Sequence, residues 1–282
     1  MKLSTTQHNY SRWGKDKYKK LREIGFEALD FNSGLVSGHA SCRISNEDFL
    51  AGVAEEKKLI DEAGLEVYQM HGPWRWPAND ATPEDRANRM SVMQTSIKAC
   101  AMLGCKNWVI HPIMPFGIRD LEIDKGEETW ALNIEFFTEL AKTAHEYDVK
   151  ICIENMPMPN FSIATPADIV RFIKALNDNC FAMCLDVGHV AVYPDLDLVK
   201  SVHEIKDVLR AIHVHDNQGK IDQHLIPYFG IVDWAGFGKA LRDINFSGAF
   251  SLEVEAPKAL PDPLFEDMSK LLFNIGKQIA EG

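Results

Sequence analysis

The chain has 282 residues, of which 46% are hydrophobic and 25% are charged, and its formal net charge at pH 7 is −11. This composition is typical of a soluble globular protein, and the length suits one large domain or two small ones. The acidic balance, with no basic run, argues against a phosphate backbone as ligand, so nucleic acid is not an expected partner. No apolar run of 18 residues occurs, and residues 1–13 lack the apolar core of a signal peptide. We therefore expect no membrane association and a cytoplasmic location.

The six cysteines show no CxxC spacing, and several lie within apolar runs. This pattern indicates buried free thiols, not a disulfide framework or a zinc knuckle.

Short β-like runs alternate with longer helical patterns almost to the end of the chain. The predicted strands are 2–6, 26–31, 66–71, 107–112, 150–155, 181–186, 210–215 and 249–255. The predicted helices are 15–24, 46–63, 84–103, 127–147, 166–176, 196–208, 234–243 and 263–280. Such alternation predicts a parallel sheet, and eight units in this length predict a single (β/α)8 TIM barrel over residues 1–282. A doubly wound open sheet is less favoured, because no glycine-rich dinucleotide loop follows an early strand.

Six consecutive predicted strands finish with a residue that can bind a metal. In chain order these residues are His71, His111, Glu154, Asp186, His213 and Glu253. Each one alone reads more readily as a buried core histidine or as a helix-capping carboxylate. In a barrel, however, the carboxyl ends of the strands meet at one mouth, where active sites of this fold lie. Such a mixed oxygen and nitrogen set suits one divalent ion such as Mn²⁺, Zn²⁺, Mg²⁺ or Co²⁺.

Further polar residues follow the sixth and seventh strands. In the stretch CLDVGHV, Gly188 is expected to let the backbone turn after Asp186, and His189 follows three residues after that aspartate. His215 lies two residues after His213, so both imidazoles can point into the barrel mouth. Asp222 and His224 form a DxH pattern in the loop after the seventh strand, where an ordinary turn aspartate beside an exposed histidine is an equal alternative.

These segments, CIEN, LDVGH, IHVHDN, the DxH loop and LEVE, resemble the xylose-isomerase-like TIM-barrel superfamily. That superfamily includes sugar epimerases, inosose-processing enzymes and the endonuclease IV group. In its epimerase-type members, the resemblance implies one divalent metal held by the residues matching Glu154, Asp186, His213 and Glu253. It implies that the two glutamates exchange a proton beside the substrate carbonyl, and that the residue matching His189 contacts substrate. His215 is then expected near the metal shell or facing substrate.

The endonuclease IV group implies a larger ligand set that holds up to three zinc ions. It maps onto His71, His111, Glu154, Asp186, His189, His213, Asp222, His224 and Glu253, all of which are competent ligands here. The chain departs from the family at two places. Tyr228 stands where the family often has glycine, and Gly219, with Lys220 beside it, replaces an arginine that grips substrate in some epimerases.

The sequence thus predicts a metal-dependent isomerase or epimerase of a small sugar, cyclitol or sugar acid, working through a metal-stabilised enediolate. A multinuclear zinc phosphoesterase, a sugar or inosose dehydratase, and a non-catalytic sugar-binding subunit stay open as alternatives. Trp74, Trp76 and Phe116 lie in loops after the third and fourth strands and are weaker candidates for stacking on a sugar ring. The sequence is compatible with a homo-oligomer.

Overall fold

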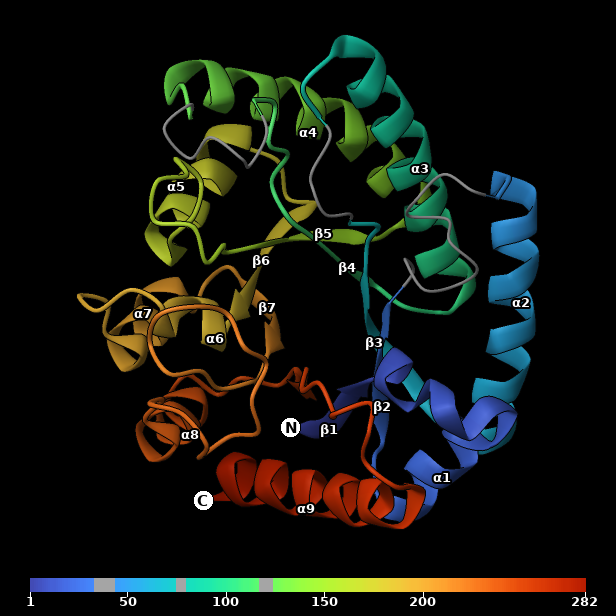
Figure 1. Ribbon diagram of the computed structural model, residues 1–282. Helices are drawn as coiled ribbons and strands as arrows, with labels where there is room; N and C mark the ends of the chain where they lie inside the picture. The colour runs from blue at the N-terminus through green and yellow to red at the C-terminus, as the bar shows by residue number, and fades with distance from the viewer. Residues whose placement is uncertain (33–43, 75–79, 117–123) are drawn as a thin grey trace.

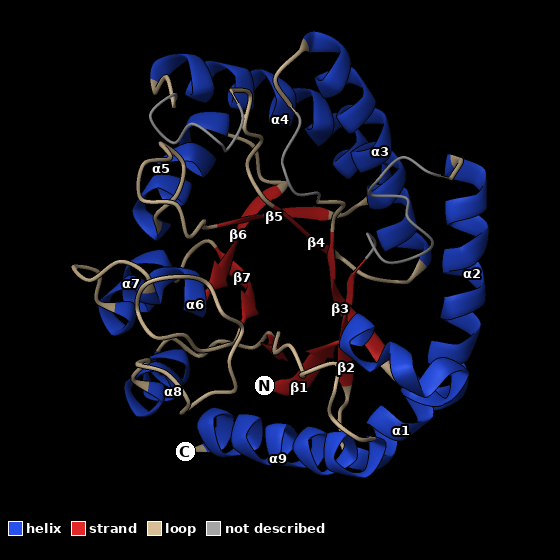
Figure 2. Ribbon diagram, in the orientation of Figure 1, coloured by secondary structure: helices blue, strands red, loops and turns tan. Residues whose placement is uncertain are grey.

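Eight parallel strands form a single sheet at the centre of the molecule, and helices surround it (Figures 1 and 2). The computed structural model describes residues 1–32, 44–74, 80–116 and 124–282. The strands are β1 (Lys2–Thr6), β2 (Ala28–Asn32), β3 (Glu66–His71), β4 (Asn107–Ile110), β5 (Lys150–Glu154), β6 (Phe181–Asp186), β7 (Leu209–His213) and β8 (Ala249–Leu252).

The sheet curls round so that its two outer strands, β7 and β8, come together. Its hydrogen-bonded order is β7-β6-β5-β4-β3-β2-β1-β8. Just beyond β7, Val214 pairs with Leu252, donating from its backbone N to Ser251 O at 2.8 Å and accepting from Glu253 N at 3.0 Å. The predicted (β/α)8 barrel is confirmed.

Helices follow nearly every strand, as the alternating pattern predicts. They are η1 (Gln7–Asp16), α1 (Lys17–Ile24), α2 (Asn46–Ala63), α3 (Pro83–Met102), α4 (Glu127–Tyr147), α5 (Pro166–Leu176), α6 (Val187–Ala191), α7 (Leu198–Ile205), α8 (Trp234–Asp243) and α9 (Asp262–Glu281). Several starts are set by side-chain caps; Thr82 and Thr165, for example, each accept a hydrogen bond from the backbone of an aspartate three residues on. Within the described residues, no helix is both long and apolar enough to span a membrane.

Two helical segments differ from the sequence prediction. The 3₁₀ segment η1 fills the whole gap between β1 and α1, and α6 begins directly after β6 where a turn was expected. The backbone of η1 is interrupted at Gly14 and α6 has only five residues, so neither carries the long apolar periodicity that identifies helices in a sequence.

The outer faces of the strands pack against the helices, with large side chains such as Trp108, Phe137 and Phe250 fully buried. Inside the barrel, small apolar side chains of β4–β7 form a separate buried cluster: Val109, Cys152, Ala182, Cys184 and Ala211. Each of these residues lies two or four positions before the polar residue at the end of its strand. Since alternate residues of a strand face the same side, the apolar cluster lies directly beneath the polar mouth. The cysteines of the described residues are all free and buried, which confirms the thiol prediction for them, whereas Cys42 lies outside the described residues.

Candidate active site

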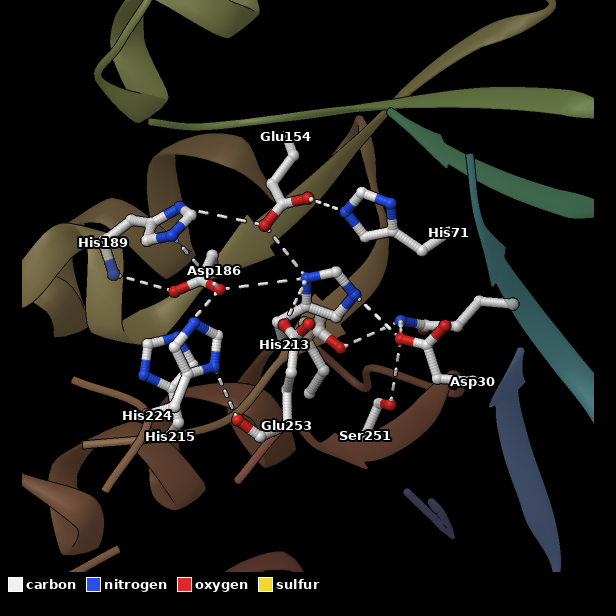
Figure 3. A network of polar contacts seen from close by, with 12 residues as sticks. Asp30, His71, Glu154, Asp186, His189, His213, His215, His224, Ser251 and Glu253 are labelled. Atoms are coloured by element: carbon white, nitrogen blue, oxygen red, sulfur yellow. Dashed lines mark hydrogen bonds and ion pairs between the residues drawn. The ribbon is translucent and has the colours of Figure 1, made fainter. Parts of the chain in front are cut away.

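The six metal-capable residues predicted at the strand ends come together at one mouth of the barrel, and Figure 3 labels all of them except His111. His71, Glu154, Asp186 and His213 are the last residues of β3, β5, β6 and β7. His111 and Glu253 follow β4 and β8 directly. All lie at the carboxyl ends of their strands, which is where this fold places catalytic groups.

Four of these residues form a compact group, here called the central cluster: Glu154, Asp186, His213 and Glu253. The Nδ1 atom of His213 lies 3.0 Å from Glu154 Oε1, 3.1 Å from Glu253 Oε2 and 3.8 Å from Asp186 Oδ2. The side chains of Asp186 and His213 are completely buried, and that of Glu154 is 2% exposed. Glu253 is 14% exposed and is therefore the member most open to the mouth.

The charges within the central cluster reinforce one another. Burial alone would raise the pKa of Glu154, but the imidazoles of His213 and His111 hold it well below its usual range. Burial would likewise lower the pKa of His213, but the carboxylates of Glu253, Glu154 and Asp30 raise it well above its usual value. Without a metal ion, the cluster therefore binds a proton on His213 and keeps Glu154 ionised at neutral pH.

Glu154 also faces a second pair of histidines. Its other oxygen, Oε2, lies 3.2 Å from His71 Nε2 and 3.1 Å from His111 Nε2. The His71 and His111 rings meet edge to face at 4.9 Å. Since these atoms all lie within 4.8 Å of one another, the three residues are a second group that could hold an ion.

The CLDVGHV stretch is built more tightly than the sequence suggested. The expected turn at Gly188 is wrong, because Asp186 caps α6 by accepting a hydrogen bond from His189 N at 2.7 Å. Gly188 is required for a different reason: a Cβ atom there would lie 1.9 Å from the Cε1 atom of His215. The glycine therefore allows α6 to approach the histidine that follows β7.

His189 points from α6 toward the loop after β7. Its Nδ1 lies 2.6 Å from Asn155 O, and its Nε2 lies 3.3 Å from Asp222 Oδ2 and 3.8 Å from Asp186 Oδ2. Burial opposes protonation of this ring, but Asp186 and Asp222 raise the pKa of His189 to about 9.

The predicted DxH residues, here called the loop pair, reach the same mouth. Asp222 Oδ2 lies 3.1 Å from His224 Nε2, while His224 Nδ1 lies 2.9 Å from Glu253 O. Burial opposes protonation of His224, but Asp222 raises its pKa to about 10. His215 stacks on His224 at 4.0 Å between ring centroids and lies 3.0 Å from Asp186 Oδ2. Neither member of the loop pair is a solvent-exposed turn residue.

One residue that the sequence did not reveal, Asp216, organises the loop that carries this pair. It is completely buried, and its carboxylate accepts hydrogen bonds from Tyr228 N, Val232 N and Trp234 Nε1 at 2.8–3.2 Å, as well as from Asn217 N. Its backbone also pairs in both directions with Leu225.

A second residue missed from the sequence, Asp30, lies on β2 beneath the central cluster (Figure 3). Its Oδ2 atom lies 2.8 Å from His213 Nε2, on the side of the ring opposite the cluster. It also accepts from Gln69 Nε2 at 2.9 Å and from Ser251 Oγ at 3.5 Å. A lone aspartate inside a predicted strand, before its last residue, gives no sequence signal of such a position.

Of the three aromatic candidates for stacking on a sugar ring, one lies next to a residue of the site in the part of the chain that the structure describes. Trp74 packs edge to face on His111 at 5.4 Å, at the rim of the site. The Phe116 ring lies under Lys125, whose Nζ is 4.3 Å from the ring centroid. Trp76 lies outside the described residues.

The two departures from the family pattern have structural counterparts. Tyr228 adopts a φ of +76°, a backbone conformation that favours the glycine common in the family. Gly219 has a φ of +78°, and Lys220 beside it is exposed on the same loop.

The family model described as xylose isomerase-like TIM barrel matches residues 18–273. The chain belongs to this family. A D-psicose 3-epimerase of Agrobacterium fabrum is 21% identical over 253 residues, which cover 88% of this chain and 81% of the relative. An inosose dehydratase of Histophilus somni is 25% identical over 157 residues, which cover 49% of this chain and 52% of the relative.

A solved structure superposes over the full length of this chain. The crystal structure of a D-psicose 3-epimerase in the presence of D-fructose has a TM-score of 0.78 at 18% identity, covering 100% of both chains. At this identity the similarity establishes the shared fold, and the chemistry of this chain has to be argued from its own residues.

Proposed function

We propose that this protein is a divalent-metal-dependent isomerase or epimerase of a small sugar, cyclitol or sugar acid. The observation that carries the proposal is the central cluster, in which three carboxylates converge on a single imidazole nitrogen. Family membership and the named sugar epimerases among the relatives support the same class.

The donor set fits a divalent cation. A proton on His213 Nδ1 can be shared well with only one of the three oxygens that lie within 3.0–3.8 Å of it. The remaining buried negative charge is costly unless a cation offsets it. Three carboxylates and one imidazole, with no thiolate among them, suit Mn²⁺, Zn²⁺, Mg²⁺ or Co²⁺. When bound there, such an ion would act as a Lewis acid toward a substrate carbonyl.

Glu154 and Glu253 are the proposed acid and base. Glu154 is held ionised by its histidine neighbours and can accept the proton from the carbon beside the carbonyl. Glu253, the most exposed member of the cluster, directly follows a different strand, and in its protonated form it would give a proton to the other face of the carbon. Glu154 would then carry the proton taken from substrate, and exchange with solvent would restore both groups. Two carboxylates on separate strands are what an epimerisation needs, because the proton leaves one face of the carbon and returns to the other.

His189 is the proposed hydroxyl-binding group. Its imidazole is buried beside Asp186 and Asp222, which favour the protonated form. Nδ1 is engaged by Asn155 O, so a substrate oxygen would take the place of Asp222 as the acceptor from Nε2. Trp74, at the rim next to His111, is a proposed stacking surface for the sugar ring.

The direct test combines metal analysis with a proton-exchange screen. The purified protein is expected to contain about one divalent ion per chain. Incubation in D₂O with ketoses, inososes and keto acids is expected to exchange the C–H beside the carbonyl of the accepted substrate. Product analysis separates epimerisation from dehydration, the reaction named for the Histophilus somni relative. Bound metal with no exchange on any of these substrates would contradict the isomerase assignment.

A multinuclear zinc phosphoesterase is the second candidate, and one observation favours it. The groups His71–His111–Glu154 and His189–Asp222–His224 lie on either side of the central cluster with ligand-type contacts of 3.1–3.3 Å. About three zinc ions per chain, together with hydrolysis of a phosphate ester, would favour this candidate. One Mn²⁺ or Mg²⁺ per chain would exclude it.

A further inference from the structure

Asp30 stands out among the buried charged residues because no step of the proposed chemistry uses it. It lies in β2, one barrel layer below the mouth, and has no exposed surface. Its Oδ2 atom takes part in all three of its side-chain contacts, with His213, Gln69 and Ser251. Its Oδ1 atom is buried and has no hydrogen-bond partner among the described residues.

The contact between Asp30 and His213 determines which ring nitrogen keeps its proton when the other nitrogen binds an ion. A carboxylate oxygen only accepts, so at 2.8 Å the His213 Nε2 atom must be the donor. In the absence of an ion, Nδ1 also carries a proton, 3.0–3.1 Å from the oxygens of Glu154 and Glu253. An ion that displaced this proton would meet the Nδ1 lone pair, because Nε2 keeps its own proton on Asp30. The opposite tautomer would set two lone pairs against each other at Asp30 and would turn an N–H toward the place where an ion would bind.

The carboxylate is itself held at a fixed position relative to β7. Gln69 Nε2 donates to Asp30 Oδ2 at 2.9 Å and lies 3.3 Å from Ile212 O, the carbonyl next to His213. Ser251, from β8, approaches the same oxygen from another strand. Three strands around His213 therefore fix the orientation of its acceptor.

A purely structural role explains this arrangement poorly. A buried carboxylate with one unpartnered oxygen costs stability, and apolar replacements of buried ion pairs are often neutral or stabilising. Carboxylate partners of metal-binding histidines, by contrast, fix the tautomer and raise the basicity of the ligand. We propose that Asp30 is a positioning residue that holds His213 with Nδ1 free for a divalent cation. This inference rests on the proposed metal-dependent function.

The test measures metal affinity and does not depend on a known substrate. The full-length chain is stripped with a chelator and titrated with Co²⁺, following both the binding isotherm and the visible absorption of the bound ion. Asp30→Asn keeps the shape but removes the charge, and it is expected to weaken Co²⁺ binding by about 10- to 100-fold and to alter the spectrum. Gln69→Leu removes a hydrogen bond to the Asp30 carboxylate but keeps its charge, so it is expected to weaken Co²⁺ binding less. This variant keeps the test usable if Asp30→Asn does not fold.

Ser4→Ala is the matched control. Ser4 is completely buried, its backbone pairs with Ser251 in the same layer, and its hydroxyl has no partner among the described residues. This variant is expected to bind Co²⁺ like the unaltered chain. If Asp30→Asn and Gln69→Leu only lower the melting temperature and bind Co²⁺ as tightly as Ser4→Ala, Asp30 is structural and the inference is wrong.

Glu154→Gln separates that failure from failure of the proposed function. If the unaltered chain binds Co²⁺ and Glu154→Gln abolishes binding, the central cluster stands whatever Asp30→Asn shows. If Glu154→Gln binds Co²⁺ as tightly as the unaltered chain, the proposed metal site itself is wrong.

Discussion

The central cluster and the loop pair supply similar side chains to one mouth, but they are held in different ways. Three cluster residues end paired strands: Asp186 is in register with His213, and Glu154 is in register with Cys184. Glu253 follows β8 directly, and its backbone N donates to Val214 O. Many sheet hydrogen bonds therefore determine where each side chain points. The loop pair depends mainly on Asp216, a single buried carboxylate that gathers the backbone and a tryptophan of its loop. We expect the cluster to tolerate local damage and the loop pair to be lost when Asp216 changes.

The largest expected effect comes from the cluster itself. Glu154→Gln removes the charge of the proposed base while keeping its shape, and turnover of the accepted substrate is expected to fall by about 10²- to 10⁴-fold. Steady-state kinetics on the substrate found by proton exchange measures the loss. Glu255→Gln, an exposed glutamate two residues after Glu253, is the control and is expected to keep nearly full activity. Equal activity of the two variants would contradict the assigned role of Glu154.

Asp216→Asn tests whether the loop depends on one residue. The amide loses the charge that accepts from four donors and turns an NH₂ group toward some of them, so the free energy of unfolding is expected to fall by about 3–4 kcal/mol. Co²⁺ binding at the central cluster is expected to stay within about twofold, since no cluster residue contacts this carboxylate. Urea unfolding measures the free energy of unfolding, and Co²⁺ titration measures the affinity of the central cluster for metal.

Asp233→Asn serves as the control for the Asp216 variant. Asp233 lies on the same loop but is exposed and caps α8 by accepting from Gly236 N at 3.0 Å. Asparagine is also a good N-cap, so only a few tenths of a kcal/mol are expected to be lost. If Asp216→Asn abolished Co²⁺ binding while Asp233→Asn did not, the central cluster would depend on the loop, contrary to this prediction.

The pH dependence of the metal-free protein sharpens the comparison further. Burial opposes protonation of His189 and His224, but their aspartate neighbours raise the pKa values to about 9 and about 10. The resulting stability is fully present below pH 6.5 and is lost as pH rises through about 9–10, with His189 alone contributing on the order of 3 kcal/mol.

The melting temperature of the metal-free protein is therefore expected to fall from pH 6 to pH 10. In Asp222→Asn this slope should be shallower, because both histidines lose a partner. Saturating divalent metal should flatten it as well if the ion takes the place of bound protons. An equally steep slope in Asp222→Asn would remove the proposed link between the loop pair and His189.

Tyr228→Gly has the smallest expected effect. Glycine relieves the unfavourable φ of +76°, but it loses the edge-to-face contact with Trp234 at 6.4 Å and adds freedom to the unfolded chain. These effects oppose one another, so the free energy of unfolding is expected to change by less than about 1 kcal/mol. Thermal unfolding measures it, and a loss above about 2 kcal/mol would show that the tyrosine ring is a main support of the loop.

The sequence was enough to predict the barrel and the residues at its mouth. In a parallel barrel the carboxyl ends of all strands lie at one mouth. Polar residues that each follow an apolar run, such as Glu154 and Glu253, could therefore be predicted to lie close together without knowledge of any contact. The roles given to these residues stay predictions until metal and substrate are measured.

The residues that support the site could not be found in this way. Asp30 lies inside a strand and Asp216 in an irregular stretch, and neither position has a periodicity or spacing that marks it. Their importance arises from contacts with His213 and with the loop before α8, between segments far apart in the chain. For Gly188 the sequence predicted a turn, whereas the residue lies in α6 and makes room for His215. That close approach is a tertiary contact, which the local sequence does not contain.

Glu154 shows what this arrangement means for genetic dissection of the site. One of its oxygens faces His213 and the other faces His71 and His111, so a substitution at Glu154 disturbs two groups at once. His71 contacts the second oxygen of Glu154, whereas Glu253 contacts His213. Variants of His71 and of Glu253 would therefore report on each group separately. A double-mutant cycle between them should show an interaction energy, because Glu154 links the two groups. The size of that energy would say whether the mouth of the barrel behaves as one titrating and metal-binding unit or as two.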